Sequence, residues 1–364
     1  MKWFCAGFFL LSIPVLYYLF KPFLKPAFAY CIAFFIAINW SFLIYTDTIG
    51  SDLPFFFFSC FSFLLMTKRN TIANQLILGG VIYFSYFTRE TGLFLIPSLI
   101  VYQLSQLKAG KLSETNRVFY FIPYLVFAVF FCLNFLLLPN GTANHYKLLF
   151  RDLSISVFTN RIYYYYYYTV CSIWFLRLGI LFFIAAIAGI IVTWKQNLHF
   201  IVYTLLTLAV LLVFPADQGV RYLFPVFPFF LFFFIKGLLY FFDILHFKIM
   251  YRKIFFAITA TALFVLNVKQ IFLYSKEDHN KCYIPEMQHI YSFISKNTSP
   301  DSIIGSKAPR VIRLFTNRNI VCTDEAHFSN SVAAYLLVAK TEYKHTNLSY
   351  KEIYQTENYI LLSK

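Results

Sequence analysis

The chain consists largely of long apolar segments separated by short polar connections. Ten of these segments read as candidate transmembrane helices, because a bilayer span needs about 20 largely apolar residues. Several are short or contain proline, which membrane helices tolerate when neighbouring helices satisfy the freed carbonyl groups. They cover residues 3–20, 27–45, 53–67, 72–88, 92–106, 118–138, 170–193, 199–214, 222–242 and 253–273. The pattern predicts an all-α polytopic membrane bundle of about ten transmembrane helices.

The pattern changes near residue 275, where the apolar segments give way to a polar tail. Within this tail, strand-like runs at 302–306, 319–323 and 359–363 alternate with helix-like runs at 285–296 and 330–340. Such alternation is typical of a small α/β domain. We therefore expect two domains, a transmembrane domain over residues 1–274 and a C-terminal α/β domain over residues 275–364.

The polar connections form two alternating sets that differ in charge. One set holds about eleven basic residues in five connections, among them Lys21, Lys68 and Lys195. The other set holds fewer basic residues and most of the loop carboxylates. Because short cytoplasmic loops are enriched in Lys and Arg, the first set is predicted to be cytoplasmic. With ten spans, the N-terminus and the C-terminal α/β domain are then both extracytoplasmic.

The composition supports a lipid environment. The chain is 60% hydrophobic and 13% charged, whereas soluble domains average about 45–50% apolar and about 25% charged residues. A net charge of +15 would suggest nucleic acid as a partner of a soluble protein. Here most basic residues lie in loops, so no nucleic-acid partner is expected. The phenylalanine run at 55–58 is expected to contact lipid.

Two carboxylates in the predicted outer connection at 46–54 are candidate catalytic residues. Asp47 and Asp52 could each act as a general base, or hold a divalent metal beside a phosphate. Asp52 has an equally good structural explanation, since Ser51 or Asp52, just before Leu53 and Pro54, could cap a helix. The sequence contains no CxxC or HExxH motif, so no metal site and no cofactor are predicted, although a divalent metal stays possible.

Charged residues in the other predicted outer connections are candidates for binding a donor phosphate or substrate. An arginine at the headgroup level can hold a phosphate oxygen or a carboxylate. Each also has a simpler explanation, such as a local Arg–Glu pair at 89–90 or an interfacial arginine at 221. The loop at 139–168 is the longest between spans, and loops of this length often bind substrate. The candidates are Arg89, Glu90, Arg151, Arg161, Asp217 and Arg221.

Four segments of the chain resemble motifs of the GT-C fold glycosyltransferases. The segment SYFTRETGLFLIPS at 85–98 is similar to their "TRPtGlllLP" turn, and RYLFPVFP at 221–228 is similar to their "RYllPllP" span start. IGSDLP at 49–54 resembles their "sDplf" segment, and residues 286–318 resemble the stretch that follows their membrane domain. The resemblance is to the bacterial branch of protein mannosyltransferases and lipid A aminoarabinose transferases, and it covers most of the chain from about residue 26.

The resemblance implies an integral enzyme of the bacterial cytoplasmic (inner) membrane. Such an enzyme takes a sugar from a polyprenyl-phosphate donor and transfers it to a lipid, glycan or protein acceptor on the extracytoplasmic face. Membrane lipids, the polyprenyl-phosphate-linked sugar and the acceptor would be its partners. Two other functions stay open, a lipid-linked glycan transporter or polymerase, and a catalytically inactive homologue.

One family feature has no counterpart in this sequence. The principal catalytic aspartate of the family lies in a long outer loop after the first span, and no such loop precedes residue 46 here. The expectation is that the family's first span and loop are missing, which also explains the predicted outside position of the N-terminus.

Overall fold

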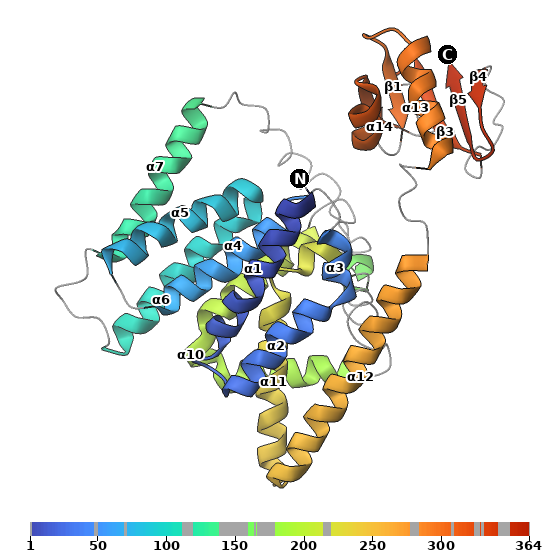
Figure 1. Cartoon of the computed structure of the whole chain (residues 1–364). Coiled ribbons are helices and arrows are strands. Elements are labelled where there is room, and N and C mark those ends of the chain that lie inside the picture. Colours follow the sequence, from blue (N-terminus) through green and yellow to red (C-terminus); the bar gives the residue numbers. More distant parts are fainter. Residues whose placement is uncertain are drawn as a thin grey trace. The chain divides into compact units, whose positions relative to one another are not determined.

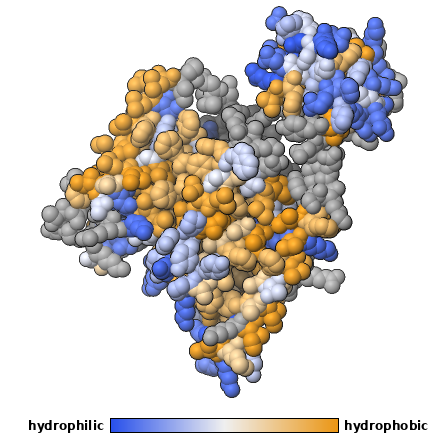
Figure 2. Space-filling model, in the orientation of Figure 1, coloured by the Kyte–Doolittle hydropathy of each residue, from blue (hydrophilic) through white to orange (hydrophobic). Residues whose placement is uncertain are grey.

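The computed structural model divides the chain into two compact units, Met1–Phe272 and Leu273–Lys364. The first unit is helical, and the second combines helices with a small sheet (Figure 1). On the face shown in Figure 2, the side chains of the first unit are mostly hydrophobic, and those of the second are mostly hydrophilic. The structure describes residues 2–46, 50–68, 71–110, 119–137, 159–163, 165, 179–213, 220–276, 284–306, 309–323, 328, 331–340 and 350–363.

The N-terminal half of the first unit is a series of apolar helices joined by short turns. The helices are α1 (Lys2–Phe20), α2 (Pro26–Ile38), α3 (Trp40–Thr46), α4 (Asp52–Thr67), α5 (Ile72–Thr88), the 3₁₀ helix η1 (Glu90–Phe94) and α6 (Leu95–Lys108). Proline begins α2, where its fixed φ angle suits the first helical turn. Thr71 caps α5, because its side chain accepts a hydrogen bond from the Asn74 amide at 3.2 Å.

The second half contains longer helices and completes the bundle. These are α7 (Ile122–Leu137), α10 (Gly179–Val213), η3 (Val220–Leu223), α11 (Phe227–Ile244) and α12 (Ile249–Lys276). Helix α10 is interrupted at Asn197, whose φ of −121° and ψ of 27° are not helical. This break falls in the polar connection predicted between the segments at 170–193 and 199–214.

The described helices do not show ten membrane spans. Five are long and apolar enough to cross a bilayer, and a sixth results if α2 and α3, bent by 53° at their junction, count as one span. Helices α4 and α5 are apolar but shorter, with 16 and 17 residues, and a straight span needs about 20. The apolar helices identify a membrane protein, but the predicted count of ten is not established by their lengths.

Helices α10 and α11 approach each other closely because glycines lie at their crossing. A methyl group added at Gly237 would lie 1.7 Å from the carbonyl oxygen of Ala185, and one at Gly189 would lie 1.9 Å from that of Phe233. Small residues allow membrane helices to pack backbone against backbone, which strengthens dispersion contacts between them.

The expectation that the run at 55–58 contacts lipid is wrong for its first half. Phe55 is 1% exposed and Phe56 is 0% exposed. Helix α4 packs against both α1 and α5, so these two rings face other helices. Phe56 and the buried Phe42 lie with ring centroids 5.0 Å apart, as part of an aromatic core.

The C-terminal unit is a mixed five-stranded sheet with helices α13 (Pro285–Asn297) and α14 (Pro309–Thr316). Its strands have the order β2-β1-β3-β5-β4, with β1 parallel to β2 and β3, and β5 antiparallel to β3 and β4. The strands are β1 (Ile303–Ser306), β2 (Asn319–Cys322), β3 (Tyr335–Ala339), β4 (Lys351–Gln355) and β5 (Tyr359–Ser363). The unit is an α/β fold, as its alternating pattern predicts.

One prediction for this unit is wrong. The run at 330–340 was expected to be helical, but β3 lies there, at the centre of the sheet. Leu336, Leu337 and Val338 are all buried, so both faces of the strand are covered. A short apolar run that is buried on both faces lacks the alternation that distinguishes a strand from a helix.

Candidate functional site

A buried ion pair joins two of the predicted site residues. Arg89 Nη2 donates to Asp52 Oδ1, which links the residue that follows α5 to the first residue of α4. The Asp52 side chain is 5% exposed and that of Arg89 is 12% exposed. The carboxylate also lies at the positive end of the α4 dipole, which attracts a negative charge. The pair therefore fixes the start of α4 against the end of α5.

A second guanidinium group approaches the same carboxylate. Arg221, in η3, lies with Nη1 3.9 Å from Asp52 Oδ2, and its side chain is 39% exposed. The Tyr222 ring lies near both arginines, with its centroid 3.8 Å from Arg89 Cζ and 5.4 Å from Arg221 Cζ. Aromatic faces attract cations, so the ring helps to hold two like charges close together.

The backbone around Arg89 forms a tight turn that directs its side chain. The Arg89 amide donates to the Ser85 carbonyl at 3.0 Å, and the Gly92 amide donates to the Arg89 carbonyl at 2.8 Å. A methyl group on Gly92 would lie 2.4 Å from the Ser85 carbonyl carbon. Glycine is therefore required where η1 folds back on the end of α5.

A buried hydroxyl network supports this turn from inside the bundle. The Ser59 and Ser85 hydroxyl oxygens are 3.2 Å apart, and the Tyr203 hydroxyl donates to Ser59 Oγ at 3.1 Å. All three side chains are 0% exposed. Since buried hydroxyl groups are costly without partners, the network fixes the register of α4, α5 and α10 behind the ion pair.

The remaining predicted residues are not brought into this cluster by the described structure. Glu90 is exposed at the start of η1. Arg161 is buried, and its Nη1 donates to the Leu212 carbonyl at 3.0 Å, at the C-terminal end of α10. An arginine at that position satisfies a free helix carbonyl. Asp47, Arg151 and Asp217 lie outside the described residues.

The structure also decides between readings that the sequence left open. Asp52 is not the N-cap of α4; that position belongs to Ser51, whose side chain makes no capping hydrogen bond. Arg89 pairs with Asp52, a residue 37 positions away, instead of with its neighbour Glu90. Arg221 lies in η3, just before α11, and not in the helix itself.

Sequence reasoning missed the residues that support the cluster. Tyr222 carried a signal, since it follows Arg221 directly in the RYLFP segment. The other three are polar residues within apolar helices: Ser59, Ser85 and Tyr203. Polar residues of this kind often pack between helices without any role near a site, so the sequence did not single them out.

The charge of the cluster indicates which ligands it can accept. Two guanidinium groups and one carboxylate leave a net charge of +1, so the cluster attracts an anion more than a cation. The partly exposed Arg221 can donate to an incoming ligand without breaking the Arg89–Asp52 pair. Among the described residues, no group of three or more His, Cys, Asp or Glu side chains is arranged to hold a metal.

Comparison with known proteins adds no family to these observations. No family model matches the sequence, and no curated protein matches it at a significant level.

Proposed function

We propose that the chain is a membrane glycosyltransferase of the GT-C type, which moves a sugar from a polyprenyl-phosphate donor to a lipid, glycan or protein acceptor. In this proposal the helical unit spans the bacterial cytoplasmic membrane about ten times. The ion-pair cluster and the C-terminal α/β unit both lie on the extracytoplasmic side.

One observation carries the proposal. Asp52, Arg89 and Arg221 belong to three segments that are far apart in the sequence, and each segment resembles a different GT-C motif. The three side chains nevertheless meet at one carboxylate. Independent resemblances that converge on one cluster favour a common function over three chance matches.

The chemistry of the cluster suits the departure of a phosphate. In the proposed reaction the acceptor hydroxyl oxygen attacks the anomeric carbon, and the bond between that carbon and the phosphate oxygen breaks. The electron pair leaves with polyprenyl phosphate, whose charge changes from −1 to −2. A fixed net positive charge at the phosphate stabilises this developing charge more than it stabilises the donor.

In the proposed mechanism the three residues have different roles. Arg221, with a side chain that is 39% exposed, would donate to the phosphate directly. Asp52 accepts from Arg89, so its role is to orient that guanidinium group and not to take a proton. The acceptor's proton then requires another carboxylate, and Asp47, outside the described residues, is the predicted base.

A turnover assay tests the proposal. The purified chain, reconstituted in lipid bilayers, is incubated with polyprenyl-phosphate-linked hexoses and pentoses together with membrane lipid and glycan acceptors. The expected result is release of polyprenyl phosphate with transfer of one sugar. Uptake of a lipid-linked glycan into sealed vesicles without cleavage of the donor would instead favour a transporter.

A further inference from the structure

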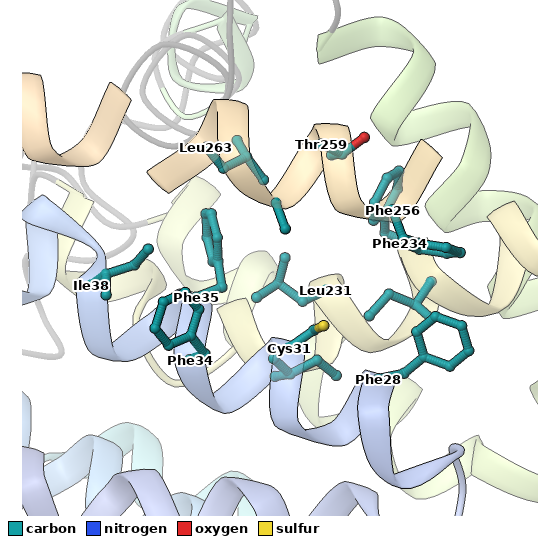
Figure 3. A pocket seen from close by; sticks show the side chains of 13 residues that line it. Phe28, Cys31, Phe34, Phe35, Ile38, Leu231, Phe234, Phe256, Thr259 and Leu263 are labelled. Atoms are coloured by element: carbon teal, nitrogen blue, oxygen red, sulfur yellow. The ribbon is translucent and has the colours of Figure 1, made fainter. Parts of the chain in front are cut away.

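An apolar slot lies between α2, α11 and α12 (Figure 3), and its lining includes no residue of the ion-pair cluster. It holds about 620 Å³ of empty space, including the part open to the surroundings. Its lining is apolar except for the Cys31 thiol and the Thr259 hydroxyl. A ligand that fills the slot must therefore be apolar along its length.

The slot runs along α2. It follows α2 from Phe28 to Ile38, a distance of about 15 Å at 1.5 Å per residue. Phe28 and Phe256 meet near one end, with ring centroids 4.7 Å apart. Phe34 stacks on Phe264 toward the other end at 6.3 Å. Two aromatic contacts thus hold α12 beside α2 at the two ends of the slot.

The slot is continuous with the lipid-facing surface of the helical unit. Helix α12 diverges from α11 above the turn that joins them (Figure 1), and only 6% of its apolar span is buried. The surrounding solvent for such a helix is the hydrocarbon of the bilayer. A gap that opens onto this surface is filled by lipid chains, because the side chains lining an empty apolar slot would lack dispersion contacts on that side.

The two ends of the slot differ in charge. At the Phe28 end, Lys25 lies one helical turn before Phe28, whose amide donates to the Lys25 carbonyl at 2.9 Å, and Lys248 lies two turns before Phe256. Both lysines are exposed. Arg252, at the same end, already has protein partners, since it pairs with Asp243 and donates to the Phe242 and Phe247 carbonyls.

The opposite end of the slot is polar and also carries charge, because the exposed Lys269 lies two residues after Asn267 in α12. The break between α2 and α3 lies at this end, and α12 supplies a hydrogen-bond partner for its backbone. The Trp40 amide donates to Asn267 Oδ1 at 3.0 Å. Asn39 Oδ1 accepts from the Ser41 amide at 3.0 Å, which completes the turn. Lys25 and Lys248 together place more positive charge at the Phe28 end than Lys269 places at the other, so the Phe28 end attracts an anionic headgroup more strongly.

We propose that this slot binds an acyl chain of an anionic phospholipid, with the lipid phosphate beside Lys25 and Lys248. The inference does not depend on the proposed glycosyl transfer. Arg221 precedes α11 and Lys248 follows it, so the ion-pair cluster and this headgroup lie at opposite ends of that helix. The bound lipid is a component of the membrane that fastens α12 to the bundle, and it is not the sugar donor.

Photo-crosslinking tests the proposal. The full chain is reconstituted in phosphatidylcholine bilayers that contain a trace of phosphatidylglycerol or phosphatidylcholine with a photoreactive diazirine in one acyl chain. Crosslinked peptides are then identified by mass spectrometry. We expect the phosphatidylglycerol probe to label slot residues on α2 and α12 in clear excess over the phosphatidylcholine probe.

Two variants and one matched control separate a specific site from general lipid contact. Ala260→Phe fills the slot and should abolish the labelling, whereas Ala262→Phe, at an exposed position outside the slot lining, should leave it unchanged. Lys25→Gln should reduce the preference for phosphatidylglycerol roughly fivefold, the factor expected for one lysine near anionic headgroups.

Three results would overturn the proposal. The first is equal labelling of the slot by the two probes. The second is equal sensitivity to Ala260→Phe and Ala262→Phe. The third is displacement of the probe by polyprenyl phosphate, which would make the slot part of a donor site. Since no result involves turnover, a failure here leaves the proposed transferase activity untouched.

Discussion

Arg89 donates to the carboxylate of Asp52 and thereby connects the turn after α5 to the first turn of α4. The pair is buried, and the guanidinium group of Arg221 lies on the other oxygen of the same carboxylate. Two consequences follow from this relationship. The pair should be important for stability, and Arg221 should be the residue that meets a ligand.

Removing either member of the ion pair should destabilise the helical unit. Arg89→Ala leaves a buried carboxylate without its partner, which typically costs about 3–5 kcal/mol. Asp52→Ala leaves the guanidinium group unpaired in the same way. Thermal unfolding of the purified variants in one detergent measures both effects.

The double variant provides the control for that experiment. Asp52→Ala combined with Arg89→Ala should cost less than the sum of the two single changes, with a coupling of about 0.5–3 kcal/mol. Strictly additive effects would mean that the two side chains do not interact in the membrane.

The glycine crossing of α10 and α11 gives a prediction about the fold. Gly237→Ala places a methyl group 1.7 Å from the Ala185 carbonyl oxygen, so the helices must separate. The expected loss is at least about 3 kcal/mol, the upper end of overpacking costs. Gly80→Ala is the matched control, because nothing lies within 4 Å of its added methyl group. Equal unfolding temperatures for the two variants would contradict the close crossing.

The C-terminal unit should lose stability at acidic pH through Glu286. Its carboxylate accepts hydrogen bonds from the Asn358 side-chain Nδ2 at 2.9 Å and from the Asn358 backbone N–H at 2.7 Å. These hydrogen bonds, the Asn358 side chain first, together with one from Thr356 and the charge of Lys340, hold the pKa of Glu286 below its usual value. The bonds join the first turn of α13 to the connection between β4 and β5.

The sign of this effect follows from the lowered pKa. The contribution is fully present above the unfolded pKa of about 4.3, and it is lost as the pH falls through the lower folded value. Because Glu286 is only partly buried, solvent screens the interaction, and the contribution should stay under about 1 kcal/mol. Amide hydrogen exchange of β5 between pH 7 and pH 3 should show this loss in the parent chain and not in Glu286→Gln. The same loss should persist in Glu352→Gln, which removes an exposed carboxylate on β4.

The hydrophobic pattern predicted the helices of the first unit well, because each one is specified locally. The segment expected at 72–88 is the helix Ile72–Thr88, and the one expected at 53–67 is the helix Asp52–Thr67. The pattern could not show that α3 departs from α2 by 53°. That bend depends on Asn267, which comes from a helix more than 200 residues later. The strand at 335–339 was missed for the same kind of reason, since burial on both faces results from the neighbouring strands.

The sequence could identify the residues of the site, but it could not show which of them contact one another. Charged residues beside apolar segments are conspicuous, so Asp52, Arg89 and Arg221 could be singled out from the sequence. Which of them meet depends on how α4, α5 and η3 pack, and no local pattern specifies that. The supporting hydroxyl network of Ser59, Ser85 and Tyr203 joins three helices and was therefore invisible in the sequence.

Arg221→Ala should impair function with little effect on folding. Its side chain is 39% exposed and lies 3.9 Å from Asp52, and such a partly exposed pair contributes about 0–1 kcal/mol to stability. Its loss should lower donor turnover by roughly 10- to 100-fold, as expected when a charged hydrogen bond to the ligand is removed. Arg313→Ala, at an exposed position in α14, is the control and should keep full turnover. An unfolding temperature that drops as far as in Arg89→Ala would assign Arg221 a structural role instead.

Equilibrium binding of polyprenyl phosphate tests the central claim most directly, because it does not require the acceptor or the sugar to be known. The chain in lipid bilayers is titrated with radiolabelled polyprenyl phosphate and, separately, with the corresponding polyprenyl alcohol. The account predicts that the phosphate form binds roughly 10- to 100-fold more tightly, and that Arg221→Ala removes this difference while leaving the affinity for the alcohol unchanged. Equal affinities for the two lipids in the parent chain would contradict the assignment of the Asp52–Arg89–Arg221 cluster as a phosphate site.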